Sequence, residues 1–222
     1  MMNKLTALNG IYLITDRQLS LARQMPIENM VQQAIAGGVR LIQYRNKQSS
    51  LSTTKYEAAI VAKLCRAHNV TFLVNDDIDI ALAVDADGVH IGQDDTSLTK
   101  ARALLGPDKI IGVSCYNSFD LAKQAQTDGA DYVAFGRFYP SRSKPNASPA
   151  TIDTLQKACQ QLDMPICAIG GITPLNAPNL LNNGAHMLAV IHSILASPNI
   201  RRAAQEFTDL FHTKSPATDE IV

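Results

Sequence analysis

Two apolar runs of the sequence end abruptly in clustered carboxylates. The run "LVNDD" spans residues 73–77, and the run "GVHIGQDD" spans residues 88–95. Asp76 and Asp95 carry the hard oxygen atoms that suit Mg²⁺, which usually takes one or two carboxylates and leaves its other positions to water and substrate phosphate. We therefore predict that Asp76 and Asp95 are ligands of a Mg²⁺ ion.

The other acidic residues of these runs have ordinary structural explanations. Asp77 and Asp79 open a helical segment, where a carboxylate caps backbone N–H groups and suits the helix dipole. Asp94 is expected to be a loop residue. Taken alone, either acidic cluster fits turn or helix-cap chemistry as well as it fits a metal site. The neighbouring basic residues are what favour the metal.

Basic residues also gather after apolar runs. The segment "QYRNK" at 43–47 carries Arg45 and Lys47, and Lys144 lies in "FYPSRSKPNASP" at 138–149. These cations could share the phosphate charge that a metal does not neutralise, which favours a diphosphorylated ligand. The three prolines of the second segment predict a mobile lid that brings Lys144 and serine hydroxyls to a phosphate and excludes water.

A second anion site is suggested by the segments "AIGGI" at 168–172 and "VIHSI" at 190–194. Loops after the last two strands of an α/β barrel often hold a phosphate through backbone N–H groups. Gly170 and Gly171 would let the backbone approach closely, although a glycine pair can also simply end a buried strand. For His192 we expect the backbone N–H, rather than the imidazole, to contact the phosphate. Two anion sites imply two phosphorylated substrates, or one phosphorylated at both ends.

Histidine and cysteine give weaker signals. His90 lies in the middle of an apolar run, where a hydrogen-bonded core histidine and a pocket-lining one are equally expected. Cys115, next to Ser114, could be mistaken for a nucleophile, but no histidine is placed in the sequence to activate it. The cysteines lack metal-ligand spacing and are expected to be reduced core residues: Cys65, Cys115, Cys159 and Cys167.

The elements that must position these residues alternate regularly. Short β-branched runs alternate with longer segments of helical periodicity, which is typical of βαβ units and a parallel sheet. The count of eight runs favours an α/β fold of the closed (β/α)₈ TIM-barrel type, with an open doubly wound sheet as the alternative. The runs cover residues 10–16, 39–45, 70–76, 87–92, 109–115, 131–137, 165–171 and 186–192.

Composition limits the class of protein. The chain has 222 residues, of which 46% are hydrophobic, enough for one barrel domain over 1–222 with a short polar tail from about residue 214. Its 20 basic and 20 acidic residues cancel, so no overall field attracts nucleic acid or an anionic membrane. Asn9 and Gly10 interrupt the N-terminal apolar run, so we do not expect a signal peptide. No apolar stretch is long enough to span a membrane. We expect a cytoplasmic enzyme acting on small molecules; a homo-oligomer is compatible with the sequence.

In their order and spacing, these motifs resemble the thiamine phosphate synthase family over residues 10–208. The resemblance rests on "YLITDR", "QYRNK", "NDD", "ADGVHIGQDD", "GVSCYN", "ADYVAFGRFYPSRSK", "AIGGI" and "AVIHSI". It implies a (β/α)₈ barrel and a transferase that joins 4-amino-2-methyl-5-(diphosphooxymethyl)pyrimidine to 4-methyl-5-(2-phosphooxyethyl)thiazole. Thiamine phosphate and pyrophosphate are the products, and the family is thought to release pyrophosphate first.

The resemblance also assigns site residues. It implies catalytic roles for Lys144, Arg45 and Ser114, and Mg²⁺ ligation by Asp76 and Asp95. The pyrimidine diphosphate site would comprise Gln43, Tyr44, Arg45, Asn46, Lys47, Asn75, Ser114 and Lys144. The thiazole phosphate site would comprise Ser141, Arg142, Ser143, Gly171, Ile191 and His192. This chain departs from the family pattern in having serines where threonine is common in the lid, in His192, and in lacking a glycine before the last strand.

Two other functions compete with this one. A thiazole tautomerase-like paralogue would share the barrel and the thiazole site but would need no diphosphate-binding acidic and basic cluster. A non-catalytic barrel that binds phosphate ligands would show binding without turnover. The acids and bases at the predicted strand ends favour the synthase.

Overall fold

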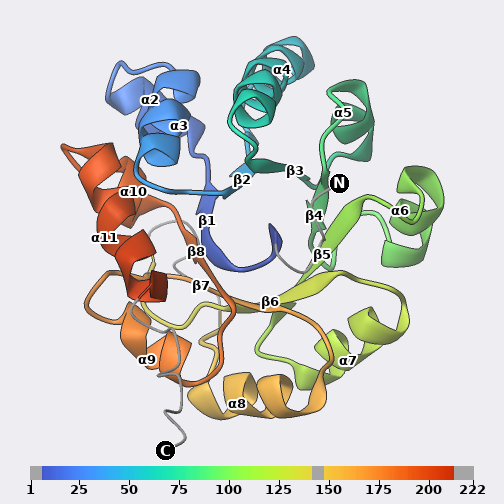
Figure 1. Cartoon of the computed structure of the whole chain (residues 1–222). Coiled ribbons are helices and arrows are strands. Elements are labelled where there is room, and N and C mark those ends of the chain that lie inside the picture. Colours follow the sequence, from blue (N-terminus) through green and yellow to red (C-terminus); the bar gives the residue numbers. More distant parts are fainter. Residues whose placement is uncertain (1–6, 142–147, 213–222) are drawn as a thin grey trace, which may run out of the picture.

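The computed structural model of the chain describes residues 7–141 and 148–212. Its eight strands form one closed, parallel barrel in chain order, with helices around the outside (Figure 1). The pairing of the first strand with the last, in which Tyr12 lies opposite Ala189, closes the barrel. The prediction of a (β/α)₈ barrel is confirmed, and the open-sheet alternative is wrong. The predicted tail from residue 214, and Arg142, Ser143 and Lys144 of the predicted lid, lie outside the described residues.

Each predicted run overlaps one strand. Seven strands are shorter than their runs by two or three residues, and β5 has the length of its run but is shifted by one residue. The strands are β1 (Gly10–Ile14), β2 (Leu41–Tyr44), β3 (Thr71–Asn75), β4 (Gly88–Ile91), β5 (Ile110–Tyr116), β6 (Tyr132–Gly136), β7 (Ile166–Ile169) and β8 (Met187–Val190). The helices are α2 (Arg17–Ala22), α3 (Ile27–Ala36), α4 (Leu51–Ala67), α5 (Ile78–Ala83), α6 (Leu98–Leu105), α7 (Phe119–Thr127), α8 (Ile152–Gln161), α9 (Ala177–Asn182), α10 (His192–Leu195) and α11 (Ile200–His212).

The helices begin where the sequence supplies a capping side chain. Asp77 accepts a hydrogen bond from the backbone N–H of Ile80, which confirms its predicted helix-start role, and Asp79 lies in the first turn of α5. Side chains that cap other helices in the same way are Asp16, Ser50, Ser97, Ser118 and Thr151. A cap satisfies N–H groups that the helix itself leaves unpaired. None of the helices within 7–141 and 148–212 has the length and apolar composition needed to cross a membrane.

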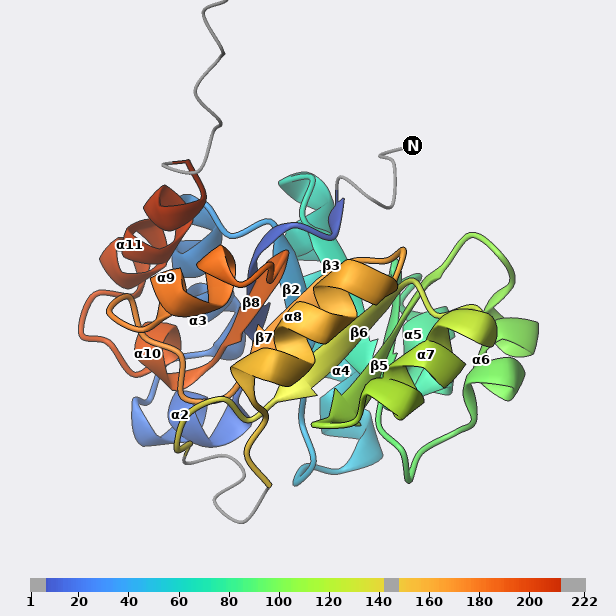
Figure 2. The same cartoon turned by 90° about the horizontal axis from the view of Figure 1, so that it is seen from below.

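Two helices were not separately predicted. The short helices α2 and α10 precede the longer α3 and α11, and they lie near each other at the lower left of Figure 2. They touch each other: Nη1 of Arg23, at the end of α2, donates to the backbone carbonyls of Leu195 (2.9 Å) and Ser197 (2.5 Å). This contact fixes one side of the barrel mouth.

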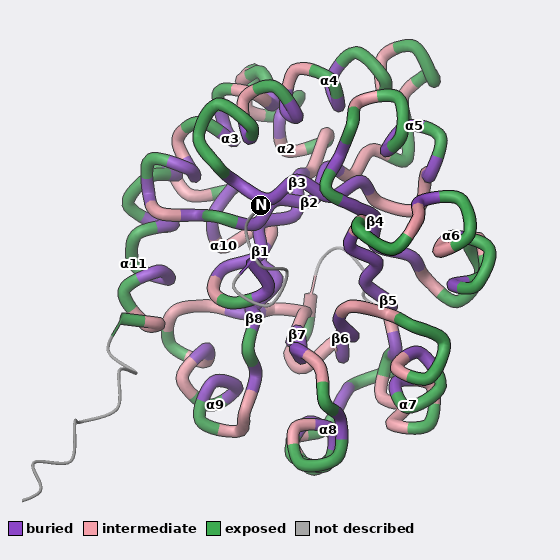
Figure 3. The backbone as a smooth tube through the Cα atoms, turned by 45° about the vertical axis from the view of Figure 1, so that its right-hand side comes forward, coloured by how far each residue is buried: buried purple, intermediate pink, exposed green. Residues whose placement is uncertain are grey.

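The hydrophobic core has two layers, because successive side chains of a strand point to opposite faces. The larger layer lies between the strands and the helices, and the smaller one fills the barrel interior. The strands are buried along most of their length, whereas the outer faces of the helices are exposed (Figure 3). In β2 this alternation sends Leu41 inward and Tyr44 outward.

The cysteines are free thiols, as expected. Cys65, Cys115 and Cys167 are buried, and burial raises the pKa of each to about 12. Cys159 is half-buried, and burial raises its pKa to about 11. Cys115 packs in the layer between the strands and the helices. A protonated thiol there cannot act as a nucleophile, so that alternative is not supported.

Candidate active site

A cavity of about 340 Å³ opens at the carboxyl ends of the barrel strands. In an α/β barrel this end carries the active site, because the loops after the strands converge there. Its walls include residues from all eight strands or the loops that follow them. The predicted site residues that line it are Gln43, Arg45, Asn75, Ser114, Ser141, Gly171, Ile191 and His192.

A continuous chain of hydrogen bonds forms the floor of this cavity. Nε2 of Gln43 donates to the hydroxyl of Tyr12 (2.5 Å), which lies 2.8 Å from the hydroxyl of Tyr132. That hydroxyl lies 2.8 Å from Nδ1 of His90, and Nε2 of His90 lies 2.9 Å from Oγ of Ser114. The chain thus runs across the barrel interior and ends on two residues, Gln43 and Ser114, that both face the cavity.

The donors and acceptors of these groups allow one continuous direction of hydrogen bonding. The Gln43 amide nitrogen donates to Tyr12, which leaves the Tyr12 hydroxyl hydrogen available to Tyr132. In that direction Tyr132 donates to Nδ1 of His90, and Nε2–H of His90 donates to Ser114. Burial holds the pKa of Tyr12 and Tyr132 well above the usual tyrosine range, so both hydroxyls stay protonated. In that direction Ser114 accepts from His90 and keeps its own hydrogen available to a ligand in the cavity. His90 is therefore both a hydrogen-bonded core residue and a lining residue.

Removing one member of this chain should measurably destabilise the protein. In Tyr12→Phe, the Gln43 amide loses its acceptor and the Tyr132 hydroxyl loses a hydrogen-bond partner, both inside the barrel. Buried polar groups left without partners cost about 1–3 kcal/mol, so urea unfolding should show a loss in this range. Tyr56→Phe is the matched control, because Tyr56 is 68% exposed and should change stability by less than about 0.5 kcal/mol. Equal stability of the two variants would contradict the hydrogen-bonded floor.

The predicted metal ligands lie side by side at the rim. Partial burial raises the pKa of Asp95, and the adjacent Asp76 carboxyl raises it further. Oδ2 of Asp95 accepts from the backbone N–H of Gly92 (2.8 Å), and the backbone N–H of Asp76 donates to the carbonyl of His90 (2.8 Å). Nζ of Lys47 lies 2.9 Å from Oδ2 of Asp76. Two strand ends and the loop after a third thus bring two acids and a base together.

This donor set fits a hard divalent cation that is completed by a ligand. Among the residues described, no group of three or more His, Cys, Asp or Glu side chains is placed to hold a metal. Two ionised carboxylates this close repel each other, and a cation between them would remove that repulsion. Mg²⁺ commonly binds proteins through one or two carboxylates together with substrate phosphate. Asp76 and Asp95 therefore suit Mg²⁺ better than a cation that needs a full protein cage.

The glycine pair after β7 permits a close approach between loops. A Cβ on Gly171 would lie 2.3 Å from the carbonyl oxygen of Pro140, and one on Gly170 would lie 2.3 Å from Cβ of Arg137. Both glycines have positive φ, of 106° and 63° for Gly170 and Gly171, which explains why β7 ends before them although the predicted run includes them. The loop after β6 thus packs directly on the loop after β7. His192 begins α10 beside them.

Two predicted substrate contacts lie elsewhere. The side chain of Tyr44 is buried between β2 and the helices, where its hydroxyl donates to Oε2 of Glu57 (2.8 Å). The side chain of Asn46 also donates to Oε2 of Glu57 (3.1 Å). Neither residue lines the cavity. Their predicted role in substrate binding stays untested, but their side chains face away from the site.

The sequence reasoning missed other residues that face the cavity. Tyr12 lines it, and Tyr132 lies beneath it through the hydrogen-bonded chain. The signal was present, because the period of two along β1 and β6 places both tyrosines on the inward face. Arg137 and Ser193 also line the cavity, the latter donating from Oγ to the backbone carbonyl of Ile172 (2.5 Å). Arg137 directly follows β6 and Ser193 lies shortly after β8, so both were candidates for polar residues at the barrel mouth.

Comparison with known proteins agrees with this geometry. A family model described as thiamine monophosphate synthase matches residues 11–194. A thiamine-phosphate synthase of Thiobacillus denitrificans is 46% identical over 202 residues, 91% of this chain and 94% of the relative. One of Alcanivorax borkumensis is 43% identical over 216 residues, 95% of this chain and 97% of the relative.

A solved structure is similar over the same extent. Thiamine phosphate pyrophosphorylase from Pyrococcus furiosus has a TM-score of 0.84 and 33% sequence identity, covering 95% of this chain and 97% of that one. The matched family model includes all eight strands apart from the first residue of β1. From this agreement in sequence, extent and barrel geometry, we conclude that the chain belongs to the thiamine monophosphate synthase family.

Proposed function

We propose that this chain is a thiamine phosphate synthase. It joins 4-amino-2-methyl-5-(diphosphooxymethyl)pyrimidine to 4-methyl-5-(2-phosphooxyethyl)thiazole and releases pyrophosphate. The observation that carries the proposal is the cluster of Asp76, Asp95 and Lys47 beside a cavity with a polar floor, in a chain of this family. A thiazole tautomerase-like barrel has no diphosphate to bind and would not need this cluster.

In the proposed reaction, the C–O bond between the pyrimidine methylene and the diphosphate breaks first. The electron pair leaves with pyrophosphate, and the thiazole nitrogen then supplies the pair that forms the new C–N bond. Stabilising the departing charge is therefore the main task of the site. Arg45 and Lys47 would share this charge, and Ser114 would donate its hydroxyl hydrogen. Mg²⁺, held by Asp76 and Asp95, would neutralise part of the diphosphate charge.

The rest of the site would hold the reactants and exclude water. Gln43, oriented by Tyr12, presents its amide to the cavity and suits a heterocycle that carries an amino group. Gly171, Ile191 and His192 surround the place proposed for the thiazole phosphate. A pyrimidine methyl cation would react with water, so a closed, mostly apolar cavity favours attack by the thiazole. Ser143 and Lys144 are proposed to act from the lid.

The proposal is tested by mixing the purified protein with both substrates and Mg²⁺ and measuring thiamine phosphate and pyrophosphate by chromatography. Both products should form in equal amounts, stop forming when a chelator removes the metal, and form again when Mg²⁺ is restored. Reactions that lack one substrate are the controls. Folded protein that binds both substrates without forming either product would instead identify a non-catalytic barrel.

A further inference from the structure

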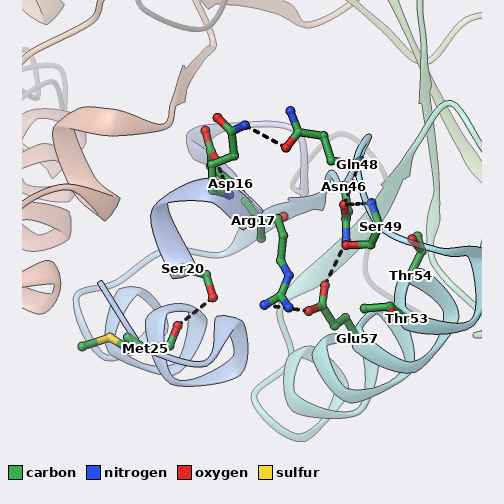
Figure 4. A network of polar contacts seen from close by, with 12 residues as sticks. Asp16, Arg17, Ser20, Met25, Asn46, Gln48, Ser49, Thr53, Thr54 and Glu57 are labelled. Carbon is green, nitrogen blue, oxygen red and sulfur yellow. Dashed lines mark hydrogen bonds and ion pairs between the residues drawn. The ribbon is translucent and has the colours of Figure 1, made fainter. Parts of the chain in front are cut away.

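Glu57 on α4 is a buried acid behind the cavity, and the proposed function gives it no role. It is only 7% exposed, and Figure 4 shows its carboxylate between Arg17 and Asn46. We propose, resting on the function proposed above, that Glu57 is a positioning residue that holds the loop after β2 in the shape needed to bind the diphosphate. It does so together with Arg17, from the side of the loop that faces away from the cavity.

The contacts of Glu57 come from three separate segments. Oε1 pairs with Nη1 of Arg17 at the start of α2 (3.1 Å). Oε2 accepts from the hydroxyl of Tyr44 at the end of β2 (2.8 Å) and from Nδ2 of Asn46 in the following loop (3.1 Å). A buried carboxylate is tolerated only when it is paired and hydrogen-bonded, and here both oxygens have partners. A glutamate that served only as a polar surface residue of α4 would lie on the exposed face of the helix, whereas Glu57 is buried.

Asn46 connects Glu57 to the loop after β2. While its amide nitrogen binds Glu57, its Oδ1 accepts from the backbone N–H groups of Gln48 and Ser49, each at 3.2 Å. Such an asparagine turn defines the path of the backbone. Figure 4 shows Asn46 between Glu57 on one side and Ser49 on the other. The loop is therefore fixed at its centre by one side chain.

The neighbours of Asn46 are the cations that the diphosphate requires. Arg45 lines the cavity, and Lys47 reaches Asp76 at the rim. The backbone N–H of Arg45 also donates to Oγ1 of the buried Thr15 (2.9 Å). Because residue 46 is held from behind, residues 45 and 47 are directed forward to the site. Preorganised cations lose less conformational entropy when they bind an anion, so this anchor should increase diphosphate affinity.

Arg17 explains why a negative charge is tolerated behind an anion site. An unpaired carboxylate at this position would repel the diphosphate through the protein interior. The Arg17 guanidinium neutralises it, while the carboxylate keeps acceptors for Tyr44 and Asn46. A glutamine at position 57 would place its N–H₂ group either against Arg17 or against the donors Tyr44 and Asn46, and would remove the negative charge that pairs with Arg17.

The decisive variants are Glu57→Gln and Asn46→Ala. Both should raise the KM for the pyrimidine diphosphate and weaken binding of pyrophosphate with Mg²⁺ by roughly 10-fold or more, as loss of a supporting partner commonly does. The KM for the thiazole phosphate should change by less than about 2-fold, because that site is built from the loops after β6, β7 and β8. A general loss of folding would affect both substrates alike.

The controls separate the possible explanations. Glu206→Gln removes an exposed acid that pairs with Arg202 on α11, and should leave both KM values unchanged. Asn46→Ala keeps the ion pair between Glu57 and Arg17. It therefore still tests the positioning role if Glu57→Gln does not fold. Variants with unchanged pyrophosphate affinity, or with equal changes in both KM values, would overturn the positioning role. A wild-type protein that binds pyrophosphate but makes no product would refute the proposed function alone, and one that binds neither substrate nor pyrophosphate would refute both.

Discussion

Asp76→Asn should lower kcat/KM for the proposed synthase reaction by roughly 100-fold or more, because it removes one of the two carboxylates proposed to hold Mg²⁺ against the departing diphosphate. The variant should also change how pyrophosphate binding depends on the metal. In the wild type, the acid pair repels the diphosphate until Mg²⁺ is present. The single remaining acid repels it less and binds Mg²⁺ more weakly, so calorimetric titration of pyrophosphate should show a much smaller gain in affinity on adding Mg²⁺.

The matched control for this prediction is Asp79→Asn. Asp79 lies three positions further on, is exposed, and belongs to the first turn of α5. Its replacement should change stability by only about 0.3–1 kcal/mol through the helix dipole and should leave turnover unaffected. If Asp76→Asn kept full turnover, or kept the wild-type dependence on Mg²⁺, Asp76 would not be a metal ligand. Its pairing with Lys47 would then be its main role.

Gly112→Ala should cause a large loss of stability. Gly112 lies on the inward face of β5, and a Cβ there would be 1.9 Å from Cζ and 2.4 Å from the hydroxyl oxygen of Tyr132. Tyr132 is fully buried and hydrogen-bonded to both Tyr12 and His90, so its ring cannot move without breaking the cavity floor. Overpacking usually costs about 1–3 kcal/mol, and we expect at least the upper value here, measured by urea unfolding.

Gly129→Ala is the control that separates the effect of a steric clash from the effect of backbone strain. Gly129 has a φ of +88°, but nothing lies within 4 Å of the Cβ position. Alanine should therefore cost roughly 1–2 kcal/mol through conformation alone. Gly112 does not have a positive φ, so its loss must come from the clash. A Gly129→Ala variant at least as unstable as Gly112→Ala would contradict this account.

The sequence alone predicted the strands, their parallel arrangement and much of the barrel mouth. Short β-branched runs that alternate with helical segments are typical of parallel strands joined by helices, and the count of eight favoured a closed barrel over an open sheet. Because the strands are parallel, every residue that directly follows one lies at the same end. Because Asp76, Asp95 and Lys47 lie at or shortly after strand ends, that rule predicts them at one mouth, and the structure brings them side by side.

The tertiary structure decided which side chains meet inside that frame. Tyr12, His90 and Tyr132 come from β1, β4 and β6, and their contact depends on how far the strands are staggered around the barrel. The alternation of side chains gives the direction of each residue but not its height along the barrel axis. The sequence therefore marks inward positions without showing that these three form one hydrogen-bonded chain.

The loop after β2 shows the same limit. "QYRNK" reads as one run of ligand-binding residues, yet Gln43 and Arg45 face the cavity while Tyr44 and Asn46 face Glu57, a residue on the next helix. The sequence determined that this loop lies at the mouth, because strand order fixes where a loop begins. The alternation along β2 already points Tyr44 away from the site, whereas the packing of α4 against β2 decided the direction of Asn46, because Glu57, eleven residues further along, accepts from its amide.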